Sequence, residues 1–171
     1  MQRACDCSIV ASRLNEIQSN QTNSFKGRFE MSTEQNKSIV RRWIEEGWNK
    51  HNPAVVDQFY SASYVQHDAG QPPLQGREGL KQYVGVFLTA FPDLRFTIDD
   101  LIAEGDKVAW RFTSTATHTG SFMSIPPTGK HSAVTGSVVF HLADSQIAEG
   151  WVNFDAMGLM QQLGVIPVPG G

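Results

Sequence analysis

The chain has 171 residues, of which 40% are hydrophobic and 18% charged, the composition of one globular domain of ordinary size. Its 14 Lys and Arg against 17 Asp and Glu give a net charge of −3, so it lacks the basic excess with which proteins bind nucleic-acid phosphates. No apolar run approaches the roughly 20 residues that cross a bilayer. We therefore expect a soluble protein that binds neither nucleic acid nor membrane.

Residues 1–30 differ from the rest of the chain because they are rich in Asn, Gln and Ser. Cys5 and Cys7 both lie in this segment, too close in sequence to cross-link a core. The segment also lacks the apolar stretch of a signal peptide. We predict a disordered or appended tail at residues 1–30, one domain at 31–167, a short tail at 168–171 and a cytoplasmic location.

Helical spacing dominates the first half of this domain. Ser32 and Gln35 have the spacing of a capping box, and apolar residues follow at intervals of three and four. Pro53 opens a second helix, and Pro92 stops a third. The pattern predicts helices at about residues 32–48, 53–60 and 77–91, with a short extended piece at 64–68.

After Pro92 the apolar period changes from 3.6 to 2, which predicts strands at about residues 95–103, 107–117, 132–142 and 146–154. A final helix is expected at 155–163, where Gly164 ends it. Helices followed by antiparallel strands, without βαβ alternation, indicate an α+β fold. We expect three N-terminal helices on a curved antiparallel sheet of about four main strands, with a short C-terminal helix.

Motifs for several chemistries are missing. The sequence has no glycine-rich nucleotide loop and no Gly-x-Ser-x-Gly turn. The histidines show no spacing that would place two metal ligands on one element: His51, His67, His118, His131 and His141. We therefore expect neither a metal nor a cofactor, which leaves acid–base chemistry by single polar residues.

Three strand-end residues are candidates for proton transfer. His118 ends a strand and His67 lies in the extended piece, where each is either a proton carrier or a solvated or hydrogen-bonded structural histidine. Asp155 follows the last strand and is either a base or the N-cap of the final helix. Arg111 alternates with Trp110 on its strand and faces either a cavity or the solvent.

Five motifs in order carry a resemblance. They are Ala90-Phe91-Pro92-Asp93-Leu94-Arg95, Ile102-Ala103-Glu104-Gly105-Asp106, Thr117-His118-Thr119-Gly120, Ile125-Pro126-Pro127-Thr128-Gly129 and the ending Trp151-x-x-x-Asp155-x-x-Gly158-Leu159-x-x-Gln162-Leu163-Gly164. Over about residues 36–167 the chain resembles the SnoaL-like polyketide cyclase, or ester cyclase, family. The resemblance implies a ketosteroid-isomerase-like cone, a polyketide-like or other small apolar carbonyl ligand, no cofactor, and a homodimer or higher homo-oligomer.

The resemblance also bears on the site. In the family's founding cyclase an aspartate on the last strand is the acid/base, and a histidine on the preceding strand assists it. Counting along the chain places Val152 and Val138 at these positions, so the resemblance implies that both polar groups are absent here. His118 matches a histidine of the family, and His67, Trp151 and Asp155 match positions that many of its ester-cyclase-like members carry.

We therefore expect a catalytic set of Asp155, His118 and His67, in which apolar neighbours raise the pKa of the Asp155 base. The expected substrate-binding residues are Arg111, Trp151, Trp110, Val138 and Val152.

The expected function is cofactor-free acid/base catalysis of the cyclase or isomerase type, on a polyketide ester or related apolar carbonyl compound in a cone-shaped pocket. Two alternatives are a non-catalytic module that binds a small molecule and a dimerisation domain with a vestigial pocket. Valine at positions 138 and 152 favours these alternatives, whereas polar candidates on a pocket wall would favour the enzyme.

Overall fold

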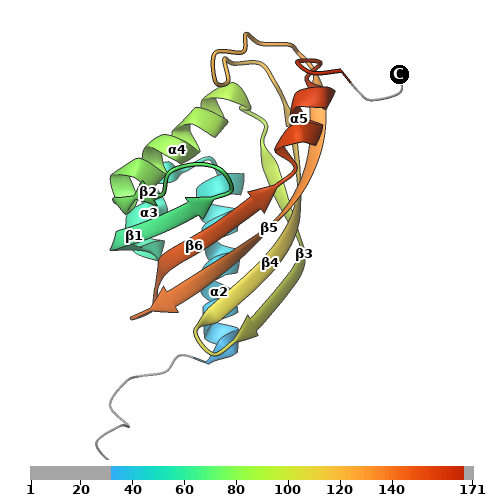
Figure 1. Cartoon of the computed structure of the whole chain (residues 1–171). Coiled ribbons are helices and arrows are strands. Elements are labelled where there is room, and N and C mark those ends of the chain that lie inside the picture. Colours follow the sequence, from blue (N-terminus) through green and yellow to red (C-terminus); the bar gives the residue numbers. More distant parts are fainter. Residues whose placement is uncertain (1–31, 168–171) are drawn as a thin grey trace, which may run out of the picture. The chain divides into compact units, whose positions relative to one another are not determined.

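A computed structural model describes residues 32–167, in which helices cover one face of a six-stranded sheet (Figure 1). The tails expected at residues 1–30 and 168–171 lie outside the described residues. Within the described part, no helix is long and apolar enough to cross a membrane.

The first helix begins as the sequence predicts. In α2 (Thr33–Trp43) the Ser32 hydroxyl accepts from the Gln35 backbone at 3.2 Å, and the Gln35 side chain accepts from the Ser32 backbone at 2.9 Å. The helix then continues as a π-helical segment, η1 (Ile44–Asn49). Gly47 lies in this segment because any Cβ there would overlap the Trp43 ring.

The second helix has the expected extent, but it consists of a 3₁₀ turn, η2 (Pro53–Val55), and one α-helical turn, α3 (Val56–Phe59). The chain then passes directly into β1 (Tyr60–Asp68), so the extended piece expected at 64–68 is a full strand. The two later helices are α4 (Gly76–Ala90) and α5 (Ala156–Gln162).

The sheet is larger than the four antiparallel strands expected. Its order is β2-β1-β6-β5-β4-β3, and β1 pairs with β6 in parallel while the other pairs are antiparallel. The remaining strands are β2 (Leu74–Gln75), β3 (Arg95–Glu104), β4 (Lys107–Thr117), β5 (His131–Ala143) and β6 (Gln146–Phe154). The α+β class is as predicted, but the antiparallel sheet of about four strands is corrected to a mixed sheet of six.

The two faces of the sheet follow the two-residue period of its strands. On β4, Trp110, Phe112 and Ser114 are buried beneath the helices, whereas Arg111 and Thr115 are exposed on the outer face. Figure 1 shows α2 and α4 on the same side of the sheet. The core and the cavity described next lie between these helices and the inner face.

Candidate active site

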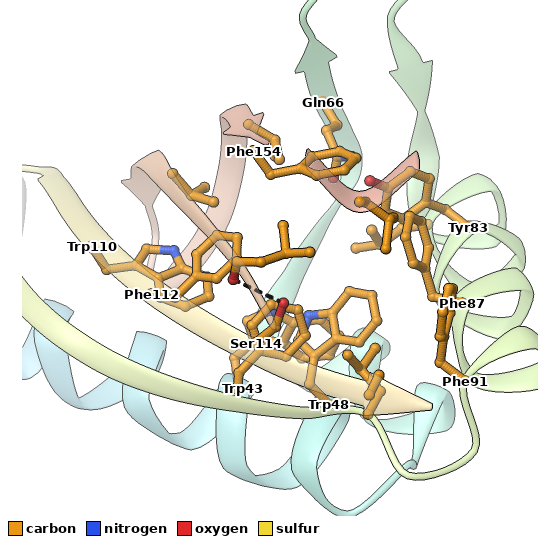
Figure 2. A pocket seen from close by; sticks show the side chains of 18 of the residues that line it. Trp43, Trp48, Gln66, Tyr83, Phe87, Phe91, Trp110, Phe112, Ser114 and Phe154 are labelled. Carbon is orange, nitrogen blue, oxygen red and sulfur yellow. Dashed lines mark hydrogen bonds between the residues drawn. The ribbon is translucent and has the colours of Figure 1, made fainter. Parts of the chain in front are cut away.

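A cavity of about 100 Å³ lies between the helices and the inner face of the sheet. Most of its lining side chains are aromatic or aliphatic, and none is a charged residue or a histidine. Figure 2 shows this wall, with Trp43 and Trp48 on one side, Trp110 and Phe112 on another, and Phe87 and Phe91 from α4 and its end. Such a wall favours an apolar ligand.

Five lining side chains are partly exposed to solvent: Phe96 on β3, and four others that lie on α4 and β6. Tyr83 and Phe87 come from α4, and Val152 and Phe154 come from the end of β6. Figure 2 shows Tyr83 and Phe154 at the border of the cavity, near Gln66. The mouth therefore lies between α4 and the end of β6.

The polar part of the wall is built on β1, where residues 64, 66 and 68 share the inner face. The buried Tyr64 hydroxyl donates to Gln66 Oε1 at 3.2 Å. Gln66 Nε2 donates in turn to both carboxylate oxygens of Asp68, each at 3.0 Å. Of these three residues only Gln66 lines the cavity, and it connects a fully buried phenol to a half-buried carboxylate.

Burial shifts the titration of the groups around Gln66. It raises the pKa of Asp68 above its ordinary value of 3.8, and the hydrogen bond from Gln66 partly opposes this shift. Burial also raises the pKa of Tyr83, and the negative charge of Asp68 raises it further. Next to Gln66 there is therefore a carboxylate, Asp68, that gains a proton more readily than usual, and a phenol on the wall, Tyr83, that keeps its own.

The hydroxyls on the sheet side of the cavity are already engaged. Ser114 Oγ donates to the carbonyl of Val134 at 3.2 Å, and Ser132 Oγ donates to the carbonyl of Ala116 at 3.3 Å. In contrast, Trp110 Nε1 is buried and has no hydrogen-bond partner among residues 32–167. Trp110 thus presents an unused donor on the cavity wall.

The expected catalytic set is not brought together. His67 alternates with Gln66 and Asp68, so its side chain lies on the outer face, where Nε2 is 2.8 Å from Glu149 Oε1. Its ring stacks on Trp151, with 5.4 Å between the ring centroids. Trp151, expected to bind substrate, is 37% exposed on that same outer face and does not line the cavity.

His118 is fully buried, but it belongs to a loop contact and not to the cavity wall. Its Nδ1 accepts from the Thr128 backbone at 3.3 Å and lies 3.2 Å from the Thr128 hydroxyl. Its ring packs against Phe91 at 5.1 Å, and its Nε2 has no partner among the described residues. These contacts fix His118 where the chain after β4 folds back.

Asp155 is the N-cap of α5, because its Oδ1 accepts from the Gly158 backbone at 2.7 Å. Arg111 is also displaced from its expected role, since its side chain is 55% exposed and pairs with Asp100 at 2.7 Å and Asp99 at 3.1 Å. Among the expected substrate-binding residues, Trp110, Val138 and Val152 line the cavity.

Gln66, Asp68 and Tyr83 were missed by the sequence analysis. The alternation Tyr64-x-Gln66-x-Asp68 was a usable signal for two of them, because it places Gln66 and Asp68 on the same strand face as a tyrosine that is expected to be buried.

The comparisons with known proteins agree with this fold. A candidate polyketide cyclase from Acidithiobacillus ferrooxidans is 31% identical, with a TM-score of 0.70 over 79% of this chain and 99% of that one. AclR, a candidate hydroxylase from Streptomyces galilaeus, is 27% identical, with a TM-score of 0.73 over 81% and 87%. A protein with a ketosteroid isomerase-like fold from Catenulispora acidiphila is 18% identical, with a TM-score of 0.64 over 74% and 92%, which shows the fold alone.

The comparison with curated proteins finds no match. The family model for SnoaL-like polyketide cyclases, however, matches residues 38–163, most of the part that the structure describes. The chain belongs to the SnoaL-like polyketide cyclase family.

Proposed function

We propose that the chain catalyses a cofactor-free proton transfer, of the cyclase or isomerase type, on an apolar carbonyl compound such as a polyketide ester. The observation that carries this proposal is the half-buried Asp68, whose pKa is raised, beside the cavity-lining Gln66 and Tyr83. A carboxylate with a raised pKa is a stronger base than an ordinary one once it is ionised.

The register of the sheet supports Asp68 as the base. One row of paired residues crosses four neighbouring strands: Asp68, Val152, Val138 and Trp110. Two of its members are the valines that stand at the family's expected acid/base positions. The carboxylate at the β1 end of the row is thus next to a position where the resemblance places an aspartate.

The proposed reaction needs no co-reactant, because the proton that Asp68 removes is returned to the product. The Asp68 carboxylate removes a proton from a carbon next to a carbonyl, and the Tyr83 hydroxyl donates a hydrogen bond to the enolate oxygen that develops. In a cyclisation the enolate carbon attacks a second carbonyl of the same molecule, a carbon–carbon bond forms, and the alkoxide takes the proton back from Asp68. The product is an isomer of the substrate.

Exchange of the acidic protons of ethyl benzoylacetate in D₂O, followed by NMR, tests the proton transfer. We expect the full chain to accelerate exchange above the buffer rate and Asp68→Asn to lose about 100-fold or more of this acceleration. Asp155→Asn should retain it, because asparagine also caps a helix. Full acceleration with Asp68→Asn would contradict the assignment, and loss with Asp155→Asn would return the role to Asp155.

We also propose that the chain forms a homodimer through the outer face of its sheet. An apolar row crosses this face: Ile102, Ala109, Val139 and Trp151. Ile102 is 67% exposed, and Val139 and Trp151 are each 37% exposed. Large apolar side chains that adjoin on one exposed face favour association with another surface.

Light scattering after size exclusion tests the homodimer. Wild-type chain should have twice the monomer mass, and Val139→Lys, which places a charge in the middle of the row, should shift it towards monomer. Thr115→Lys is the matched control, because Thr115 is exposed on the same face outside the row. A monomeric wild type, or equal dissociation by both variants, would contradict this interface.

A further inference from the structure

Trp110 carries the buried donor on the cavity wall that no other group of the described protein uses. The side chain is 4% exposed, and its ring is held between Phe96 and Phe112, with centroid distances of 6.0 and 4.9 Å. The indole therefore cannot swing out to hydrogen-bond to bulk water. A buried N–H without an acceptor is unfavourable, so a ligand that supplies one gains affinity.

Three other buried donors of the wall already have acceptors within the protein. The Ser114 and Ser132 hydroxyls donate to strand carbonyls, and the Gln66 amide donates to Asp68. His118 Nε2 is the other buried side-chain atom without a partner in residues 32–167, but His118 does not line the cavity. Of the two buried side-chain atoms without a partner in the described part of the chain, Trp110 Nε1 is thus the one that belongs to a residue of the cavity wall.

The remainder of the wall defines the kind of acceptor. Its lining residues include no Lys, Arg or His, so a buried carboxylate would have no counter-charge. A ketone or ester oxygen accepts a hydrogen bond at a much smaller desolvation cost than a carboxylate. The rest of the ligand should be aromatic or aliphatic, to match the surrounding rings.

We infer that Trp110 is a specificity-determining residue, whose indole N–H binds the carbonyl oxygen of a neutral, ring-bearing ligand inside the cavity. This inference rests on the cavity of the proposed function and names the chemistry of its ligand. The Cα atoms of Asp68 and Trp110 lie three strand spacings apart in the same row, roughly 14 Å. Trp110 therefore orients the ligand from the other end of the row that begins at the base.

Three probes of nearly equal shape test the inference with the full chain. Acetophenone carries the carbonyl, ethylbenzene replaces it with a methylene, and benzoate adds a negative charge. We expect wild-type protein to bind acetophenone about tenfold more tightly than ethylbenzene, which is the effect of one satisfied hydrogen bond. Benzoate should bind at least tenfold more weakly than acetophenone.

Trp110→Phe keeps an aromatic ring but removes the donor, and we expect it to lose the preference for acetophenone over ethylbenzene, because the ketone oxygen is then buried without a donor. Any change of cavity shape affects both probes, so the ratio of their affinities isolates the N–H. Trp151→Phe, on the outer face, should keep the wild-type ratio. Near-UV circular dichroism and urea unfolding establish that both variants are folded.

NMR of the four tryptophan indoles gives a second readout. The Trp110 indole proton, assigned from the signal lost in Trp110→Phe, should move downfield when acetophenone binds and not when ethylbenzene binds. A preference that persists in Trp110→Phe, an unmoved indole signal, or no binding of either probe would overturn the inference. If the preference is lost in Trp110→Phe while Asp68→Asn still accelerates exchange, the ligand site stands and the proposed base is wrong.

Discussion

Replacing Gln66 with methionine tests the polar wall of the cavity through protein stability. Gln66→Met has nearly the same length and removes all three hydrogen bonds of the amide. The Tyr64 hydroxyl, which is 0% exposed, then has no acceptor, and a buried unpaired hydroxyl costs about 1–3 kcal/mol. We expect a loss of about 2 kcal/mol in the free energy of unfolding, or about 5 °C in Tm.

The double variant Tyr64→Phe/Gln66→Met removes both partners and should lose less than the sum of the two single variants, by about 1 kcal/mol. Urea unfolding followed by circular dichroism measures all four proteins, and Gln82→Met, at an exposed position of α4, is the control. A Gln66→Met variant within 0.5 kcal/mol of wild type, or additive effects in the double variant, would refute the network. As a second readout, the Asp68 pKa should rise further in Gln66→Met, since the lost hydrogen bond lowers it in the wild type.

The pKa of Asp68 is higher in the folded state than its ordinary value of 3.8. As the pH rises from below 3.8 through the raised pKa, the free energy of unfolding of the wild type should therefore fall relative to that of Asp68→Asn. Urea unfolding between pH 3 and 7 measures this difference, and parallel curves for the two proteins would contradict it. Asp155→Ala should lose about 1 kcal/mol while Asp155→Asn loses almost none, and equal losses would argue against the cap. Gly120→Ala should destabilise the domain by about 2 kcal/mol or more, because its Cβ would overlap the Thr89 carbonyl. Gly85→Ala, in open space on α4, should instead stabilise it by roughly 0.5–1 kcal/mol in the same urea assay, and a loss there would contradict this reasoning.

The elements that a local signal defines could be predicted from the sequence. The capping box at Ser32 and the change of period after Pro92 depend on residues a few positions apart, and the structure has α2 and β3 where these signals place them. The parallel pairing of β1 with β6 joins Asp68 to Val152, which are far apart in the chain. No local pattern encodes such a contact, so the expected sheet lacked its β1 and β2 strands.

The prediction of the site was wrong for a different reason: it placed side chains on the wrong face of their strands. A strand presents alternate residues to opposite sides, so the inward position of Trp110 already places Arg111 outward, and Gln66 facing inward places His67 outward. Arginine and histidine were chosen for their chemistry, but the alternation of the strand decides which face they occupy. His118 could not be assigned this way, because it follows its strand and its burial depends on the return of the chain at Thr128.

The size of the cavity and the position of its polar groups suggest that one region binds the substrate and another reacts with it. A protein cavity of about 150 Å³ holds one benzene molecule, so the cavity of about 100 Å³ accepts at most a single small ring or chain in this conformation. A larger substrate must therefore extend through the mouth beside Tyr83. Asp68 is half-buried near that mouth, where burial raises its pKa but water still supports its ionised form. For the proposed function, this arrangement would let the apolar interior hold one end of the substrate while the polar rim reacts with the other, and no charge would be placed in the core.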